Sequence, residues 1–237
     1  MKKQELLFTK LAKYYDFIYG FKNYEEEAQE IKSLIEKLKT SKGNSLLDVA
    51  CGTGKHLYFL KDAFKCMGVD ISDEMLKIAR KHIPDIELKK SDMVHMNLGQ
   101  KFDIITCLFS AINYVKTYDN LKKTCENFAH HLKQGGVAII EPWVKFPLHK
   151  VAYPYDDGNT QITKLFLFKM KRNLAVFDFH YLIAEKNQHV QYFQDHHELG
   201  VFDMDKTLKI MTQSGFKASY FPHKQTHEQG LYIGVKK

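Results

Sequence analysis

A glycine-rich stretch, residues 48–54 (DVACGTG), lies between a short apolar run and a helical pattern. Glycines allow the backbone to approach a ligand closely, and the N-terminus of a following helix attracts a carboxylate or a phosphate. Asp70 ends the next apolar run, where a carboxylate can bind the two hydroxyls of a ribose. Asp92 and Met93 follow the third run, where the edge of an adenine would lie. Because open α/β sheets bind ligands at the carboxyl ends of their strands, this pattern indicates a nucleoside-binding site.

Two other nucleotide-binding loops are disfavoured by the same residues. A dinucleotide-binding loop needs a third small residue at the position that Leu57 occupies. A phosphate-binding P-loop needs Ser or Thr after Gly54-Lys55, where this chain has His56. A tight turn without a ligand is the remaining alternative, and the two acids in register argue against it.

The histidines and cysteines do not have the spacing of a metal site. The pairs at 130–131 and 196–197 are adjacent, so their side chains diverge on a helix and point to opposite faces on a strand. The cysteines also lack metal spacing, and they are Cys51, Cys66, Cys107 and Cys125. We expect no bound metal. Without a secretory signal, a reduced cytoplasmic protein is the default expectation.

Composition narrows the class of protein. Of 237 residues, 44% are hydrophobic and 27% are charged, which excludes a disordered tail, a collagen-like repeat and a coiled coil. No apolar run approaches the roughly 20 residues of a membrane span. The net charge of +7 favours an anionic partner, but only Arg80 and Arg172 are arginines among the 35 basic residues. Such scarce arginine argues against dense contacts with nucleic acid.

The first half of the chain alternates strand and helix patterns. We expect strands at residues 45–50, 66–70, 86–90, 102–109 and 137–141. We expect helices at residues 24–40, 55–64, 73–82 and around 121–132, with Ser72 as an N-cap and Gly135-Gly136 closing the last one. This alternation predicts an α/β fold with a parallel sheet and helices on both faces.

The pattern changes after Trp143. Residues 144–160 hold two of the five prolines and predict a loop. Strand patterns at 162–170, 175–184 and 189–202 then predict antiparallel strands, followed by a helix at 203–214 and strands at 216–221 and 231–235. We therefore expect one domain formed by residues 1–142 and 203–237, with residues 143–202 inserted as an antiparallel β cover over the substrate site.

The segments LLDVACGTG, GVDIS, SDM and LKQGGVAIIEPW resemble the class I S-adenosylmethionine-dependent methyltransferases over about residues 40–142. A closer resemblance extends almost end to end. LLDVACGTGKHL, TCLFSAINY, GGVAIIEPW, HYLIAE and GLYIGV are similar to the N,N-dimethyltransferases of nucleotide-linked amino sugars, of the desosamine and mycaminose type. This resemblance implies a Rossmann-like sheet of seven strands, the last antiparallel, with an antiparallel β cover.

The resemblance also implies a set of residues that contact S-adenosylmethionine. They are Asp48, Ala50, Gly52 and Gly54 in the glycine loop, Asp70 at the ribose, Asp92 and Met93 at the adenine, Leu108 toward the methyl group, and Tyr15 closing over the cofactor. Simple helix packing is the alternative for Tyr15, and a place in a core strand is the alternative for Leu108.

Methyl transfer to an amine needs a neutral nitrogen held in line with the carbon–sulfur bond. The related sugar enzymes have a histidine where this chain has Tyr114, which is a poor base but can orient the amine. We favour proton loss through solvent or from the substrate itself. His180, His197 and Glu141 are further candidates, although a lone histidine on a strand is more often structural.

The expected substrate carries a nucleotide diphosphate, which the family holds with an arginine that Lys164 replaces here. Arg172 is a second candidate, unless it is a solvated turn residue. Trp143 either packs on the substrate or seals the cover against the sheet. We expect no nucleic acid, because residues 109–114 (FSAINY) lack a Pro-Pro-aromatic motif, no membrane, and a possible homodimer.

Three other functions stay open at this point. The first is a small-molecule N- or O-methyltransferase with an unrelated acceptor, because this fold exchanges acceptors readily. The second is a nucleic-acid methyltransferase, which the positive charge suggests. The third is a regulatory protein that binds the cofactor without turnover.

Overall fold

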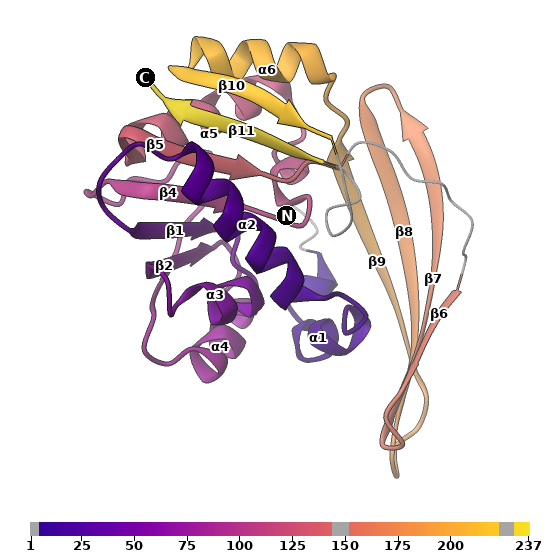
Figure 1. Cartoon of the computed structure of the whole chain (residues 1–237). Coiled ribbons are helices and arrows are strands. Elements are labelled where there is room, and N and C mark those ends of the chain that lie inside the picture. Colours follow the sequence, from indigo (N-terminus) through magenta and orange to yellow (C-terminus); the bar gives the residue numbers. More distant parts are fainter. Residues whose placement is uncertain (1–4, 144–151, 223–229) are drawn as a thin grey trace.

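Short apolar runs form the main sheet of the computed structural model, which describes residues 5–143, 152–222 and 230–237 (Figure 1). Its strands are β1 (Ser45–Val49), β2 (Lys65–Asp70), β3 (Glu87–Lys90), β4 (Phe102–Cys107), β5 (Leu132–Ile140), β10 (Phe216–Phe221) and β11 (Leu231–Lys236). They are ordered β10-β11-β5-β4-β1-β2-β3, and β11 is antiparallel to both of its neighbours. The predicted seven-stranded α/β sheet with an antiparallel last strand is confirmed.

Helices cover both faces of this sheet, as the apolar periodicity predicts. One core cluster joins the sheet to α2 (Tyr24–Leu38), α3 (Lys55–Leu60) and α4 (Asp73–His82), and the other joins it to α5 (Tyr118–His131) and α6 (Met204–Gln213). The side chain of Ser72 accepts a hydrogen bond from the Met75 amide, so Ser72 is the N-cap of α4 as predicted. No helix in the described ranges is long and apolar enough to cross a membrane.

A second sheet forms the predicted antiparallel cover and stands beside the main sheet (Figure 1). Its order is β6 (Ala152–Asp156), β7 (Thr160–Lys171), β8 (Leu174–Glu185) and β9 (Gln191–Gly200). Because side chains alternate along a strand, the sheet has two chemically different faces. The face that we call inner carries buried apolar residues such as Ile162, Tyr181 and Ile183, whereas the outer face exposes Leu167 and Tyr192.

The N-terminal segment, residues 5–19, packs against the inner face of the cover. It consists of η1 (Leu6–Phe8), η2 (Ala12–Tyr14), α1 (Tyr15–Ile18) and the residues between and beside them. Its apolar side chains form one cluster with the cover, made of Leu7, Leu11, Tyr14 and Ile18 with Ile162, Tyr181 and Ile183. The segment thus covers inner-face residues that would otherwise expose a large apolar surface.

Two local predictions are wrong. Residues 152–156 form strand β6 within the region predicted as loop, and Pro154 is tolerated there because β6 lies at the edge of its sheet. Residues 144–151 of that predicted loop lie outside the described residues. In addition, α5 ends at His131, and Gly135 and Gly136 lie inside β5 rather than closing a helix. Gly135 has a φ of +72°, and the register between β4 and β5 shifts at this point, so the glycines form an irregularity in the strand.

One buried amide joins the cover to the main sheet. Asn113, in η3 (Ala111–Val115), donates its side-chain N–H groups to the carbonyl oxygens of Trp143 at 3.2 Å and Gly200 at 2.7 Å. Its side-chain oxygen accepts the amide of Trp143 at 2.7 Å. These three bonds connect the loop after β4 with the chain segments that enter and leave the cover.

We predict that Asn113→Ala lowers the free energy of unfolding by about 3 kcal/mol, because it leaves buried backbone groups without partners. Asn173→Ala, at an exposed turn between β7 and β8, is the matched control and should change it by less than about 0.5 kcal/mol. Urea denaturation measures both. Equal stability of the two variants would contradict the role of Asn113 as the joint.

Candidate active site

The glycine-rich loop follows β1 at the carboxyl edge of the parallel strands. Three alternate residues, Ala50, Gly52 and Gly54, have positive φ angles of 59°, 56° and 81°. The loop is held against β2 by the Cys51 amide, which donates to the Val69 carbonyl at 3.0 Å. A left-handed conformation at the non-glycine Ala50 is costly, and such strain is typical of functional loops. The loop therefore presents its backbone at the sheet edge, as the sequence predicts.

Asp70 ends β2 with its carboxylate fixed beside this loop. One oxygen accepts the Gly52 amide and the other accepts the Ser72 amide, both at 2.8 Å. Burial raises the pKa of Asp70, and the same two amide hydrogen bonds oppose that rise. Each carboxylate oxygen can accept a further hydrogen bond, so the group fits a vicinal diol such as that of a ribose.

Two more acids lie along the same edge. Asp48, in β1, is 2% exposed and accepts a 2.7 Å hydrogen bond from the Thr106 hydroxyl of β4. Burial raises its pKa to about 6. Asp92 follows β3, where it accepts the Val94 amide at 2.9 Å, and the Ser91 amide next to it donates to the Asp70 carbonyl. Three carboxylates thus lie at or near the carboxyl ends of three adjacent strands.

The remaining predicted cofactor residues lie close to this edge. Met93 is half-buried beside Asp92, and Leu108 is buried directly after β4. Tyr15 is half-buried in the N-terminal segment, with its ring centroid 6.2 Å from that of Phe8 and 4.8 Å from that of Tyr19. Burial raises the pKa of the Tyr15 hydroxyl well above its ordinary value, so it stays protonated.

Polar contacts tie the N-terminal segment to the glycine loop. The Thr53 hydroxyl donates to the Asp16 carboxylate at 2.6 Å, and Lys55 lies 3.6 Å from the same carboxylate. The Ser72 hydroxyl donates to the Phe8 carbonyl. The segment therefore contacts both the loop and the cover, and it closes the space between them.

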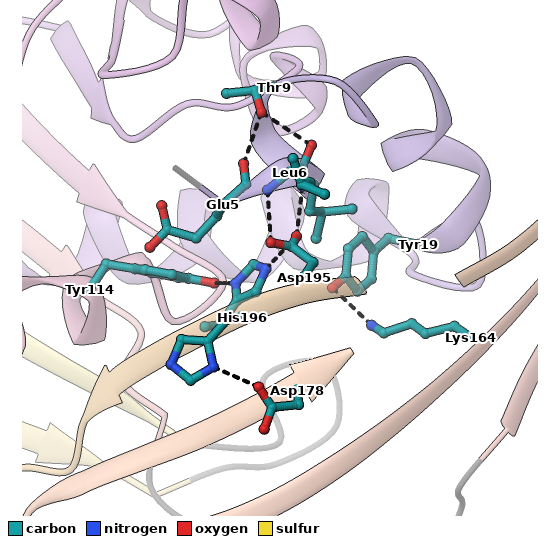
Figure 2. Close-up of polar contacts among 11 residues, drawn as sticks. Glu5, Leu6, Thr9, Tyr19, Tyr114, Lys164, Asp178, Asp195 and His196 are labelled. Carbon is teal, nitrogen blue, oxygen red and sulfur yellow. Dashed lines mark hydrogen bonds and ion pairs between the residues drawn. The ribbon is translucent and has the colours of Figure 1, made fainter. Parts of the chain in front are cut away.

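Tyr114, His197 and Asp195 form a hydrogen-bonded chain between the loop after β4 and strand β9 of the cover. The Tyr114 hydroxyl lies 2.7 Å from Nδ1 of His197, and Nε2 of His197 lies 2.8 Å from the Asp195 carboxylate. Figure 2 shows Tyr114 pointing toward the centre of this chain and Asp195 at its other end. Burial raises the pKa of Tyr114 well above its ordinary value, so tyrosinate is not available as a base.

Lys164 and Trp143 also lie on the inner side of the cover. Nζ of Lys164 is 3.1 Å from the Tyr19 hydroxyl and lies over the Phe179 ring at 4.6 Å from its centroid. The contact with Tyr19 is drawn as a dashed line in Figure 2. Trp143 is 5% exposed and packs edge-on against Phe177, with ring centroids 5.7 Å apart. This packing matches the alternative in which the indole seals the cover against the sheet.

The structure does not bring His180 and Arg172 to this cluster. His180 lies on the outer face of the cover, where its Nδ1 is 2.6 Å from the Tyr192 hydroxyl. Arg172 is exposed in the turn between β7 and β8, with a φ of +57°. Glu141 is buried and accepts the Phe109 amide at 2.6 Å, so it holds the loop after β4.

Asp195 and the joint at Asn113 were not among the residues predicted from the sequence. A signal for Asp195 was present, because residues two apart on a strand share a face, and Asp195 is two residues from His197. The amides that Asp195 accepts belong to residues nearly the whole chain away, and no local pattern indicates them.

A Rossmann-like sheet with an antiparallel last strand, a glycine loop after β1 and an acid at the end of β2 defines a class I methyltransferase. Residues 46–136 match the family model described as a methyltransferase domain. The chain is 33% identical to dTDP-3-amino-3,4,6-trideoxy-alpha-D-glucopyranose N,N-dimethyltransferase of Streptomyces venezuelae, over 94% of this chain and 97% of the relative. The chain is also 32% identical to dTDP-4-amino-2,3,4,6-tetradeoxy-D-glucose N,N-dimethyltransferase of Saccharopolyspora spinosa, over 95% of this chain and 92% of that relative.

A solved structure agrees with these relatives. The crystal structure of Streptomyces venezuelae DesVI superposes with a TM-score of 0.86 at 31% identity, over 95% of this chain and 98% of that one. The chain therefore belongs to the S-adenosylmethionine-dependent methyltransferases, in the family of the N,N-dimethyltransferases of nucleotide-linked amino sugars.

The buried Asp48 generates a prediction on pH. The folded protein keeps the proton of Asp48 up to a pH of about 6, whereas the unfolded chain loses it near 3.8. The folded state thus binds more protons between these values, so its stability falls as the pH rises through them. We predict that Asp48→Asn removes this pH-dependent loss of stability. Between pH 4 and 6 the free energy of unfolding of the cofactor-free variant should rise by about 3 kcal/mol relative to that of the wild type.

Denaturant unfolding across this pH range measures the difference, with Asp85→Asn at an exposed position as the control. A difference between wild type and Asp48→Asn that does not change with pH would contradict the assignment.

Proposed function

We propose that this protein transfers methyl groups from S-adenosylmethionine to the amino group of a dTDP-linked deoxyamino sugar and adds two of them. One observation carries this proposal: three relatives that share 31–33% identity over 94–95% of this chain are named as N,N-dimethyltransferases of such sugars. These relatives act on 3-amino and 4-amino sugars, so both positions fall within the proposed substrate class.

In this proposal the cofactor lies along the carboxyl edge of the main sheet. Asp48 and the backbone of Ala50, Gly52 and Gly54 hold the methionine end, and Asp70 accepts hydrogen bonds from the ribose. Asp92 and Met93 frame the adenine, Leu108 faces the methyl group, and Tyr15 covers the cofactor from the N-terminal segment. The supporting observations are the left-handed loop, the fixed orientation of the Asp70 carboxylate and the half-buried ring of Tyr15.

Bound S-adenosylmethionine supplies an activated methyl group, whose bond to sulfur breaks as its bond to the amine nitrogen forms. The protein holds the nitrogen in line with that bond, and such positioning contributes up to about 7–11 kcal/mol in favourable systems. The protein must also favour the neutral amine, because a simple alkylammonium has a pKa of about 10.4. Tyr114 suits the role of orienting the amine, since it follows β4 and its ring is half-buried.

The cover and the N-terminal segment would bind the rest of the substrate. We assign Lys164 to the diphosphate, because it is a cation on the inner face of the cover beside Tyr19. Trp143 would support the sugar side from the aromatic cluster beneath the cover. On this account residues 143–202 act as the substrate cover, and residues 1–142 and 203–237 as the cofactor domain. His180 and Arg172 have no part in it, because they lie away from the inner face.

The wider setting follows from the same chemistry. We infer a cytoplasmic enzyme that acts on a small nucleotide-linked substrate rather than on nucleic acid or a membrane. A homodimer is also part of this proposal.

The test of the proposed function is a turnover assay with S-adenosylmethionine and a panel of dTDP-linked 3-amino and 4-amino sugars. We predict mass increases of one and then two methyl groups on at least one of them. Confirmed cofactor binding without methylation of any panel member would refute the proposed substrate class. Methylation of an unrelated small molecule would then favour the alternative acceptor.

Lys164 generates a second prediction. Lys164→Met keeps the length of the side chain but removes the cation, so it should raise the KM for the dTDP-sugar about tenfold or more. The affinity for S-adenosylmethionine should stay unchanged. Lys169→Met is the matched control, because Lys169 is exposed on the outer face of the same strand. An equal KM in both variants would remove Lys164 from the diphosphate site.

A further inference from the structure

Asp195 accepts hydrogen bonds from two parts of the protein that are far apart in sequence. Its carboxylate accepts the amides of Leu6 at 2.8 Å and Leu7 at 2.7 Å, and its Oδ2 also lies 2.8 Å from Nε2 of His197 (Figure 2). Asp195 is 3% exposed and His197 is 1% exposed. Burial alone would raise the pKa of Asp195, but the hydrogen bonds from His197 and the two amides outweigh it, so the carboxylate stays ionised.

An ionised Asp195 fixes the tautomer of His197. A carboxylate only accepts hydrogen bonds, so Nε2 of His197 must carry the proton that points to Asp195. In the neutral ring Nδ1 is then an acceptor, and the Tyr114 hydroxyl donates to it across 2.7 Å. The lone pairs of the Tyr114 oxygen are thereby left to accept a hydrogen bond from a bound amine.

We propose that Asp195 is a positioning residue that couples closure of the N-terminal segment to removal of a proton from the acceptor amine, through His197 and Tyr114. The proposal rests on the proposed function. The bound ammonium gives one proton to the Tyr114 oxygen, and Tyr114 passes its own proton to Nδ1 of His197. The resulting imidazolium is paired with Asp195, and the nitrogen lone pair is free to form the bond to the methyl carbon.

The Asp195 carboxylate links closure of the N-terminal segment to removal of the proton from the amine. The N-terminal segment carries Tyr15 and packs on the glycine loop, and its amides at Leu6 and Leu7 are ordered by Asp195. His197 is buried while these bonds are formed, so its extra proton leaves to solvent only when the segment opens. Each of the two methyl transfers therefore requires one closing and one opening.

Other ionisable groups surround this chain on every packed element. They are Glu5 before η1, Tyr15 in α1, Tyr19 after α1, Lys164 in β7 and Tyr181 in β8. Burial raises the pKa values of Tyr114 and Tyr181 well above their ordinary range, so neither becomes a tyrosinate that could replace the histidine.

The cover contains a second histidine–aspartate pair that serves as a control. His196 and Asp178 form this pair at 2.6 Å, on the outer face of the same strands. Asp178→Asn thus removes the charge of a comparable pair without touching the inner face, whereas Asp195→Asn removes the charge that pairs with a protonated His197 and leaves one acceptor oxygen where the wild type has two. Tyr114→Phe keeps the ring and its packing, so it tests the chain even if Asp195→Asn folds poorly.

The experiment measures single-turnover methylation of a dTDP-amino sugar that the wild-type enzyme accepts, at saturating cofactor. Asp195→Asn and Tyr114→Phe should each reduce the rate about 100-fold, as expected for loss of a proton acceptor. The rate of the double variant should be no more than about twofold lower than that of Tyr114→Phe, because both substitutions break the same hydrogen-bonded chain. The rate of Tyr114→Phe should rise with pH more steeply than the wild-type rate, because without the chain the ammonium must lose its proton before it reacts. Asp178→Asn should match wild type throughout.

Hydrogen exchange at the amides of Leu6 and Leu7 supplies the second readout. Asp195→Asn should speed their exchange, and Asp178→Asn should leave it unchanged. A rate for Asp195→Asn equal to that of Asp178→Asn, or effects of Asp195→Asn and Tyr114→Phe that multiply, would overturn the proposal. Failure of the wild-type enzyme to methylate any amino sugar would instead refute the proposed function, which separates the two results.

Discussion

A buried negative charge must be paired, and the charge of Asp195 is paired by three separate parts of this fold. His197 comes from its own strand, Leu6 and Leu7 come from the N-terminal segment, and Tyr114 joins through His197 from the loop after β4. The carboxylate therefore links the segment, the cover and the loop after β4. Without the cover the main sheet could still present the glycine loop, but nothing would close the space above it.

This arrangement divides the work between the two sheets. The main sheet supplies fixed acceptors at its carboxyl edge, where Asp48, Asp70 and Asp92 lie at or near the ends of adjacent strands. The cover supplies aromatic rings, a lysine and the buried histidine on its inner face. Because methyl transfer gains most from positioning, a protein that holds two ligands between rigid sheets needs little further chemistry, apart from control of one proton.

The strands and helices of the main sheet were predictable because their signals are local. Apolar spacing marks α4 and β4, and Ser72 caps α4 within one turn. The glycine loop and Asp70 were predictable for the same reason, and the family resemblance added the rest of the proposed cofactor residues. Strand β6 was not predictable, because a proline is typical of a loop and is tolerated at position 154 only because β6 lies at the edge of its sheet. The role of Asp195 was not predictable, because the amides that donate to it lie 188 and 189 residues away in the sequence.

The central claim is that an ionised Asp195 holds His197 in the tautomer that accepts a proton from Tyr114. Nitrogen-15 NMR of the imidazole rings in the full-length protein tests it most directly, with the His197 signals identified by their loss in His197→Gln. We predict a proton on Nε2 and a bare Nδ1 in the neutral ring of the wild-type protein. A neutral ring with its proton on Nδ1 in the wild-type protein would contradict the account.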